Sequence, residues 1–299
     1  MDRLVYATRR SKLALAQSRA FVKGLSSLDP LLALEELTVV TTGDRVQDRP
    51  LSEIGGKGLF VKEIEEALSR GEADIAVHSS KDLPGEIAPG LHIGCVPVRE
   101  DPRDVLVSRS GAKLAELPHG ARIGTTSLRR RVQLAAARPD LVMVPLRGNV
   151  DTRLRKCQEG EVDAIVLARA GLVRLGLAEV VTEVLETDVC LPAVGQGALA
   201  IEQRAGDERV AVLLARVAHA ETSMAFAAER GVMIAVEGSC QTPVAAYAVR
   251  EAGRLWLRGF LAEPDGSNVR RGERREAWPA TAADAERIGR SLGVELRAR

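Results

Sequence analysis

The sequence is poor in aromatic residues, with only 2 Trp, 2 Tyr and 4 Phe among 299 residues. Proteins that bind single-stranded nucleic acid stack bases on aromatic side chains. The small number of aromatic residues therefore argues against that class. Lys and Arg number 42 and Asp and Glu 41, which gives a formal net charge of +1. A general nucleic-acid binder carries a large positive excess, so no nucleic-acid partner is expected, although a local basic pocket is still allowed.

Long apolar runs are also missing. No run reaches the ~18 residues that a membrane-spanning helix needs. The first residues lead directly into a strand-like segment at 4–7, without the charged and apolar regions of a signal peptide. We therefore expect no membrane contact and a cytoplasmic location.

Cysteine is scarce, and no two of the four cysteines form a CxxC pair. Neither a zinc site nor a thioredoxin-like motif is indicated, and we expect no metal. Cys95, Cys157 and Cys190 lie in or beside apolar stretches and are expected in the core as free thiols. Cys240 differs, because it lies in a polar loop over residues 237–243.

The sequence does contain enough apolar material for a core, with 45% hydrophobic and 28% charged residues. At roughly 150 residues per domain, the length suits two domains or three smaller ones. Short apolar segments alternate with helical patterns, which predicts α/β domains with mostly parallel sheets and helices on both faces. The expected strands are 4–7, 37–41, 75–78, 122–124, 142–145 and 164–167, and the expected helices are 11–25, 60–69, 127–137 and 150–158.

Two of these α/β domains are expected to be similar, because the segment 71–75 is echoed at 160–165 with the same order of elements. Polar breaks at 99–103 and 191–197 mark the joints between them. We predict domain 1 over 1–98 with 198–217 returning to it, and domain 2 over 99–197. After residue 218 the pattern changes to an α+β third domain: helix 222–235, strands 243–250, 254–263 and 268–276, and helix 282–296.

Hydroxyl and cationic residues gather where predicted strands end and helices begin. Such segments are 8–11, 125–131 and 146–153. Ligands of open α/β sheets bind at the carboxyl ends of the strands, and guanidinium groups with helix N-termini suit carboxylate or phosphate. For one segment alone, helix capping with surface charge is an equally good interpretation. Three segments at equivalent positions predict a polyanionic ligand.

Three further segments permit both a functional and a structural interpretation. The glycine-rich stretch 55–60 lacks the Ser or Thr of a P-loop, and with 45–52 it suits a mobile flap or an ordinary loop. Lys81 and Asp82 at a strand end form an acid/base candidate or a structural salt bridge, while His78 is expected as a core histidine. The thiol of Cys240 is a nucleophile, an attachment point or an inert group.

Taken together, these segments resemble the porphobilinogen deaminase (hydroxymethylbilane synthase) family over nearly the whole chain. The motifs that carry the resemblance are residues 7–17, 55–61, 74–84, 99–104, 124–130, 146–153, 170–176, 191–198 and the Cys240 loop. The resemblance implies two α/β domains like those of type II periplasmic binding proteins, plus a smaller α+β C-terminal domain. The implied enzyme is a monomer that joins four porphobilinogen molecules head to tail and releases ammonia at each step.

The resemblance also implies a dipyrromethane cofactor, held by a thioether to the residue matching Cys240, and a catalytic aspartate matching Asp82. Its matches for cofactor binding are Cys240, Lys81, Asp82, Thr125, Ser127, Arg129, Arg130, Arg147 and Gly148. Its matches for binding porphobilinogen and the growing oligopyrrole are Arg9, Ser11, Gln17, Lys57, Arg147, Arg153, Arg174 and Gln196.

Two other classes compete with this interpretation. A two-lobed anion-binding protein without catalysis would share the α/β domains and the basic groups, but it would have no use for a third domain with a loop thiol. A ligand-sensing domain of a regulator would need a DNA-binding segment, and no basic helix-turn-helix pattern is evident. The intact mass of the purified protein separates the first alternative from the enzyme, since only the enzyme carries a bound dipyrromethane.

Overall fold

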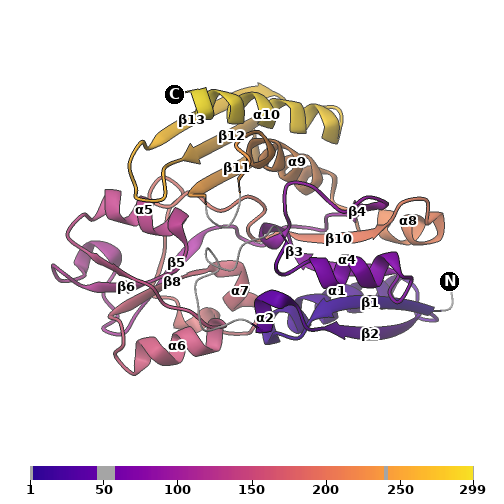
Figure 1. The fold of residues 1–299 in the computed structure, drawn as a ribbon, viewed down its shortest axis with the longest axis horizontal. Helices are drawn as coiled ribbons and strands as arrows, with labels where there is room; N and C mark the ends of the chain where they lie inside the picture. The colour runs from indigo at the N-terminus through magenta and orange to yellow at the C-terminus, as the bar shows by residue number, and fades with distance from the viewer. Residues whose placement is uncertain (1–2, 46–57, 239–241, 299) are drawn as a thin grey trace. The chain divides into compact units, whose positions relative to one another are not determined.

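The computed structural model describes residues 3–45, 58–238 and 242–298 (Figure 1). Its contacts divide the chain into two compact units. The first unit comprises Met1–Glu100 and Ala198–Met224, and the second comprises Asp101–Gly197 and Ala225–Arg299. The chain therefore leaves the first unit near residue 100 and returns to it near residue 198.

The first unit is built on a five-stranded sheet of order β2-β1-β3-β10-β4. β1 (Arg3–Arg9) runs parallel to β2 (Ala33–Val39) and β3 (Ile75–Ser79), whereas β10 (Leu199–Arg204) runs antiparallel to β3 and β4 (Leu91–Cys95). The returning segment thus supplies the one reversed strand of this sheet. Its helical elements are α1 (Lys12–Leu28), α2 (Thr42–Arg45), α4 (Lys62–Ser69), the 3₁₀ turn η1 (Ser80–Asp82) and α8 (Glu208–Ala215).

Alternating side chains of these strands enter two separate apolar clusters, because successive residues of a strand point to opposite faces. Ile75 and Val77 of β3 join the cluster that contains Leu25 of α1 and Leu214 of α8. Ala76, between them, joins the cluster that contains residues of α4. The sheet is therefore covered by helices on both faces, as the sequence predicts.

The second unit repeats this plan in a sheet of order β7-β6-β8-β5-β9. β6 (Arg122–Gly124) runs parallel to β7 (Val142–Val144) and β8 (Ala164–Ala168), and β5 (Asp104–Ser108) runs antiparallel to β8 and pairs with β9 (Glu183–Val184). Its helical elements are α5 (Leu128–Ala137), α6 (Val150–Gln158), α7 (Arg169–Arg174) and the 3₁₀ turns η2 (Leu114–Glu116) and η3 (Ala178–Val180).

The two sheets share a backbone contact as well as a strand order. The Asp74 carboxylate accepts a hydrogen bond from the N–H of Val5 at 2.8 Å, and the Asp163 carboxylate accepts one from the N–H of Arg122 at 2.8 Å. In return the N–H of each aspartate donates to the carbonyl of the same partner, at 2.8 and 2.9 Å. The echo between residues 71–75 and 160–165 therefore marks equivalent positions in two similar sheets, while the predicted bounds of domains 1 and 2 stay a prediction.

The C-terminal part of the second unit is a three-stranded antiparallel sheet with helices. β11 (Val244–Glu251), β12 (Arg254–Leu261) and β13 (Arg270–Ala277) pair in that order, and α10 (Ala282–Ala298) contacts β12 and β13. α9 (Ala220–Ala235) precedes this sheet in the chain. The expected α/β class with a smaller antiparallel α+β part at the C-terminus is confirmed, while the division into three domains stays a prediction.

Some elements differ from those expected. β2 spans 33–39 rather than 37–41, because Thr41 belongs to a turn in which its N–H and hydroxyl donate to the Asp44 carboxylate at 3.4 and 2.8 Å. The strands β4, β5 and β10 and the helix α8 were not expected. Within the described parts of the chain, no single helix is long and apolar enough to cross a membrane, although α8 and α9, with a bend of 112° between them, pass that test as a pair by length and composition alone.

Candidate active site

In the first unit, three neighbouring parallel strands end in charged side chains. Arg9 is the last residue of β1, Asp44 lies in α2 just after β2, and Asp82 closes the 3₁₀ turn after β3. Since the carboxyl ends of parallel strands lie at one edge of a sheet, these side chains come together. The Arg9 Nη2 donates to Asp44 Oδ1 at 2.6 Å, and its Nη1 donates to Asp82 Oδ2 at 3.4 Å.

Asp44 and Phe60 complete the surroundings of Arg9, and neither was among the predicted site residues. The Arg9 guanidinium lies 4.1 Å from the centre of the Phe60 ring, a cation–π contact. Burial alone would raise the pKa of Asp44, but its bonds to Arg9 and Thr41 hold that pKa below the ordinary range. Asp44 could have been found by the rule that led to Asp82, because it too is a polar residue just after a strand.

The other predicted residues of the first unit take mixed positions. The Ser11 hydroxyl caps α1 by accepting a hydrogen bond from the N–H of Ala14 at 3.2 Å. Gln17 is buried, and its Oε1 accepts from the hydroxyl of Ser79, at the end of β3, at 2.8 Å. Lys81 is exposed beside Asp82. His78 is a buried core histidine, as expected, with Nε2 2.9 Å from Glu202 Oε2.

In the second unit, the segment after β6 forms the start of α5. The Thr125 hydroxyl accepts from the N–H of Ser127 at 3.1 Å, and the Ser127 hydroxyl accepts from the N–H of Arg130 at 3.4 Å. Ser127 is thus the N-cap of α5. Thr125 and Ser127, both predicted site residues, therefore shape the turn that leads to Arg129 and Arg130 in α5.

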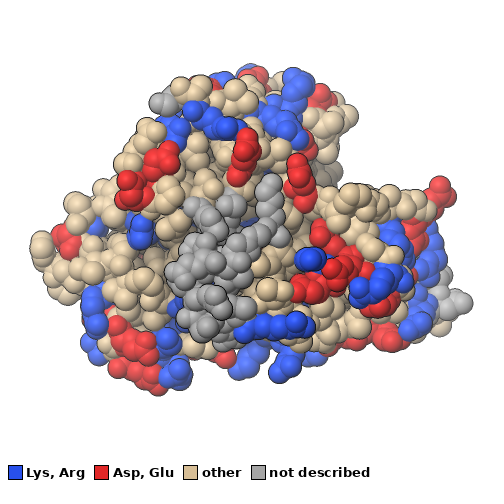
Figure 2. All heavy atoms as spheres, in the orientation of Figure 1, with Lys and Arg blue, Asp and Glu red and all other residues tan. Residues whose placement is uncertain are grey.

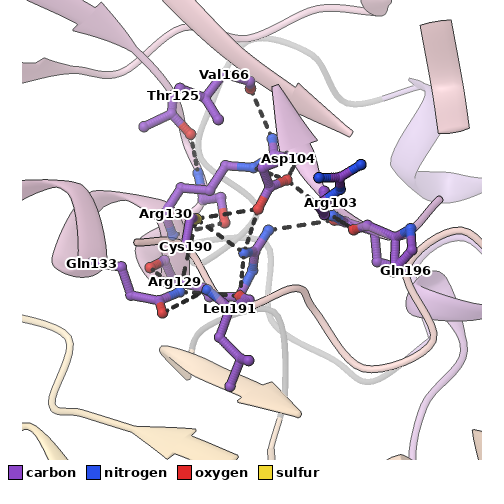
Figure 3. A network of polar contacts seen from close by, with 12 residues as sticks. Arg103, Asp104, Thr125, Arg129, Arg130, Gln133, Val166, Cys190, Leu191 and Gln196 are labelled. Carbon is purple, nitrogen blue, oxygen red and sulfur yellow. Dashed lines mark hydrogen bonds and ion pairs between the residues drawn. The ribbon is translucent and has the colours of Figure 1, made fainter. Parts of the chain in front are cut away.

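Arg129 and Arg130 are both 5% exposed, and both bind the fully buried carboxylate of Asp104 (Figure 3). The shortest contacts are 2.6 Å from Arg129 Nη1 and 2.7 Å from Arg130 Nη2. The Gln196 side chain joins the same group, donating from Nε2 to Asp104 Oδ1 at 2.9 Å. Asp104 was not predicted, since nothing near it in sequence signals two partners about 25 residues away.

Arg147 and Arg153, after β7, lie in a region of uncompensated positive charge. Arg147 Nη1 is buried without a hydrogen-bond partner among the described residues. Burial, and then the charges of Arg130 and Arg147, lower the pKa of Arg153 to about 10. Buried guanidinium groups without counterions are unfavourable unless a ligand supplies the negative charge. Together with Arg130, whose counterion Asp104 is shared with Arg129, these residues form the cationic cluster of Arg130, Arg147 and Arg153, which is therefore suited to bind an anion.

Gly148 gives the cationic cluster its backbone shape. Its φ of +121° lies in a region that favours glycine, and a Cβ there would lie 2.6 Å from Thr152 Cγ2. The Gly148 carbonyl accepts from Arg153 Nε at 2.7 Å and so fixes that side chain. Arg174, another predicted site residue, lies at the end of α7 and donates from Nη2 to the Gly197 carbonyl at 2.6 Å.

Two predicted site residues, Lys57 and Cys240, lie outside the described residues, as does most of the expected flap at 45–58. The remaining cysteines, Cys95, Cys157 and Cys190, are buried and free, as expected. Burial raises the pKa of Cys95 to about 12, which makes it an inert thiol.

The fold and these two strand edges define an α/β protein that combines an acid beside a cation with a separate cluster of anion-binding arginines. Models of protein families identify the family within this class. The porphobilinogen deaminase "dipyromethane cofactor binding domain" matches residues 4–212, and the porphobilinogen deaminase C-terminal domain matches residues 224–298. The chain belongs to the porphobilinogen deaminase family, and the resemblance drawn from its motifs is confirmed.

Similar curated proteins agree with the family models. A porphobilinogen deaminase of Sorangium cellulosum strain So ce56 is 64% identical over 294 residues, which is 98% of both chains. One from Syntrophotalea carbinolica is 50% identical, covering 98% of this chain and 91% of the relative, and one from Roseiflexus castenholzii is 50% identical, covering 98% and 95%.

The solved structures to which the chain is similar are more distant. The VFT2 domain of Bordetella pertussis BvgS has a TM-score of 0.42 at 17% identity, with 72% of this chain and 86% of that chain covered. The alkanesulfonate-binding protein SsuA from Xanthomonas axonopodis pv. citri has a TM-score of 0.37 at 14% identity, with 78% and 74% covered.

Proposed function

We propose that this chain joins four porphobilinogen molecules head to tail, releases ammonia with each addition, and frees the linear tetrapyrrole hydroxymethylbilane. Membership of the porphobilinogen deaminase family supports this reaction. The observation that carries it to this chain's own residues is the cationic cluster, with Arg147 Nη1 buried and without a hydrogen-bond partner in the described parts of the chain, and with the lowered pKa of Arg153.

The charge of the cationic cluster fits the ligands of this reaction. Every pyrrole ring of the substrate carries an acetate and a propionate, so dipyrromethane and the growing oligopyrrole are polyanions. A charge-assisted hydrogen bond from a guanidinium to a carboxylate contributes about 1.5–3 kcal/mol. We assign dipyrromethane binding to Lys81, Asp82, Thr125, Ser127, Arg129, Arg130, Arg147 and Gly148, and oligopyrrole or substrate binding to Arg9, Ser11, Gln17, Lys57, Arg147, Arg153, Arg174 and Gln196.

Asp82 is the catalytic carboxylate in this proposal. When porphobilinogen loses ammonia, its aminomethyl carbon becomes part of a cationic azafulvenium, and a nearby carboxylate stabilises that charge. The same carboxylate is suited to pass the protons that leave with ammonia and from the ring carbon that forms the new bond. Arg9, 3.4 Å from Asp82 Oδ2, holds the carboxylate in place.

Cys240 would hold dipyrromethane through its sulfur, and the bound group would supply the ring carbon that reacts with the first substrate molecule. A covalent tether keeps the growing chain bound between additions and makes each addition effectively intramolecular. The polar loop around Cys240 suits such an attachment, whereas the other three cysteines are buried.

Intact mass measurement of the purified protein tests the tether. We expect a mass excess equal to dipyrromethane in the wild type, no excess in Cys240→Ala, and an unchanged excess in the control Cys157→Ala, whose thiol is buried. Ammonia release from porphobilinogen should follow the mass excess. An active wild type of unmodified mass would contradict the proposed cofactor attachment.

We further propose a monomer in the cytoplasm with neither a nucleic-acid nor a membrane partner. The balanced composition supports the absence of a nucleic-acid partner. Figure 2 agrees, because Lys and Arg are interspersed with Asp and Glu over the described part of the face it shows. Sedimentation velocity of the purified protein tests the monomer.

A further inference from the structure

Asp104 is a fully buried carboxylate to which the proposed function gives no role. It is the first residue of β5, and its side chain is 0% exposed. Its Oδ2 accepts from Arg129 Nη1 at 2.6 Å, and its Oδ1 accepts from Arg130 Nε and Nη2 at 3.0 and 2.7 Å. Gln196 Nε2 and the Cys190 thiol add contacts at 2.9 and 3.2 Å (Figure 3).

The two arginines keep this carboxylate ionised. Burial alone would raise the pKa of Asp104, but the charges and hydrogen bonds of Arg129 and Arg130 hold it well below the ordinary value. One negative charge then faces two positive charges, so the group retains one positive charge for a ligand.

Arg129 is occupied on several sides. Its Nη1 also donates to the Leu191 carbonyl at 2.7 Å, and its Nη2 donates to Gln196 Oε1 at 3.4 Å. Arg130 is held differently. Its Nε and Nη2, which form the side-on edge of the guanidinium, both donate to Asp104 Oδ1. Its Nη1 donates to the Val166 carbonyl at 2.9 Å.

This arrangement leaves two N–H groups of Arg130 to a ligand. A guanidinium has five N–H groups, and one on Nη1 and one on Nη2 of Arg130 have no partner within the described ranges. N–H groups on two nitrogens of one guanidinium suit a carboxylate, which accepts hydrogen bonds on both oxygens. Arg130 also lies near enough to Arg153 for its charge to lower the pKa of that residue, so Arg130 belongs to the cationic cluster.

We propose that Asp104 is a positioning residue for carboxylate binding: it holds Arg130 through Nε and Nη2 and thereby keeps the remaining N–H groups of that guanidinium in place for a carboxylate of the pyrrole ligands. The inference rests on the proposed function for the identity of those ligands. A buried counterion with no effect on ligand binding is the competing role, and the two differ in what happens to KM when stability is matched.

The experiment compares Asp104→Asn with Leu106→Ala. Leu106 lies on the same strand, is 0% exposed and packs in an apolar cluster, so its truncation lowers stability while removing no hydrogen bond or ion pair of Arg129 or Arg130. Both variants are purified as full chains, their thermal unfolding is measured, and porphobilinogen turnover and intact mass are recorded at a temperature where both are folded.

We expect the KM of Asp104→Asn for porphobilinogen to rise at least tenfold over that of Leu106→Ala, with kcat changed less than threefold. We also expect the fraction of molecules carrying dipyrromethane to fall below half, while the control stays fully loaded. The amide accepts on one atom only and leaves both arginines free to move. A KM within threefold of the control, with equal loading, overturns the positioning role, and a larger rise supports it.

Asp104→Glu decides the matter if Asp104→Asn does not fold. It keeps the charge but displaces the carboxylate by one methylene, so a threefold or greater rise in KM with reduced loading supports positioning, and wild-type values overturn it.

The proposed function and the positioning role of Asp104 fail on different results. A wild type that releases no ammonia from porphobilinogen overturns the proposed function, whereas an active wild type with variants like the control overturns only the role of Asp104.

Discussion

The two five-stranded sheets have the same strand order, yet their carboxyl edges carry opposite charge balances. In the first unit, the edge of β1, β2 and β3 brings one arginine, Arg9, between two aspartates, Asp44 and Asp82. In the second unit, Arg130 follows β6, and Arg147 and Arg153 follow β7 at the same edge of the sheet. The positive charges of Arg147 and Arg153 are not balanced by described carboxylates.

In the proposed function, this difference separates the catalytic edge from the edge that binds the ligand. An edge with carboxylates beside a cation can stabilise a positive charge that appears during the reaction. An edge with an excess of guanidinium groups over carboxylates among the described residues cannot do so, but it can hold a polycarboxylate in a fixed place. In the proposed function, one architecture used twice therefore provides two complementary functions through the choice of a few residues at strand ends.

Removal of the Asp82 carboxylate should have the largest effect on this comparison. We expect Asp82→Asn to lower kcat by about 10²–10⁴-fold, because the carboxylate proposed to stabilise the cationic carbon is lost while Asp44 remains paired with Arg9. Its unfolding midpoint should stay near that of the wild type, since Asp82 is 29% exposed and its contact with Arg9 is long. Steady-state kinetics and thermal unfolding measure both, with Glu66→Gln, an exposed change on α4, as control. Near wild-type turnover would assign the chemistry elsewhere.

The cationic cluster should respond mainly in KM. We expect Arg147→Gln and Arg153→Gln each to raise the KM for porphobilinogen by about 10–100-fold, which corresponds to the loss of one charge-assisted bond. Arg155→Gln is the matched control, because Arg155 lies on the same helix but is exposed and pairs with Glu159. If the control and the cluster variants behave alike, the second edge does not bind the substrate.

Asp44 should have a smaller effect, on kcat. The bonds from Arg9 to Asp44 align the guanidinium with Asp82, so Asp44→Asn should lower kcat by about tenfold and leave KM within a factor of about three. Glu36→Gln, which breaks the contact of Glu36 with Arg19 on the same unit, serves as control. A change in KM alone would place Asp44 with the binding groups instead.

The smallest effect is a pH dependence. The pKa of Arg153 is lowered to about 10, so this guanidinium loses its charge as the pH rises through 10, where an ordinary arginine stays protonated. KM for porphobilinogen should therefore rise severalfold between pH 8 and pH 10.5, on the order of the binding lost with one cation. The rise should be absent in Arg153→Gln, and an equal rise in that variant would assign the titration to another group.

Much of this structure could be predicted from the sequence, because local signals carried it. The helix 150–158 and the strand 122–124 were predicted with the bounds observed, and the polar segments after the parallel strands pointed to both edges. The class of ligand followed from the arginines in those segments.

The rest depended on partners distant in sequence. β10 was missed because it contains Glu202, which is fully buried and lies against His78, 124 residues away. β5 was missed because it begins with the buried Asp104, whose partners are Arg129 and Arg130. A charged residue normally indicates a surface position, and only the folded chain reveals the counterion that permits its burial.

The position of β10 between β3 and β4 has a consequence for biosynthesis. When the ribosome has translated the first 100 residues, the nascent chain holds β3 and β4 but not yet the strand that must lie between them. All strands of the second sheet lie between residues 104 and 184, so that sheet can assemble earlier. The five-stranded sheet that is begun first is therefore completed after the second one, and until residue 204 emerges β3 and β4 lack the strand that lies between them, which leaves strand edges open to aggregation.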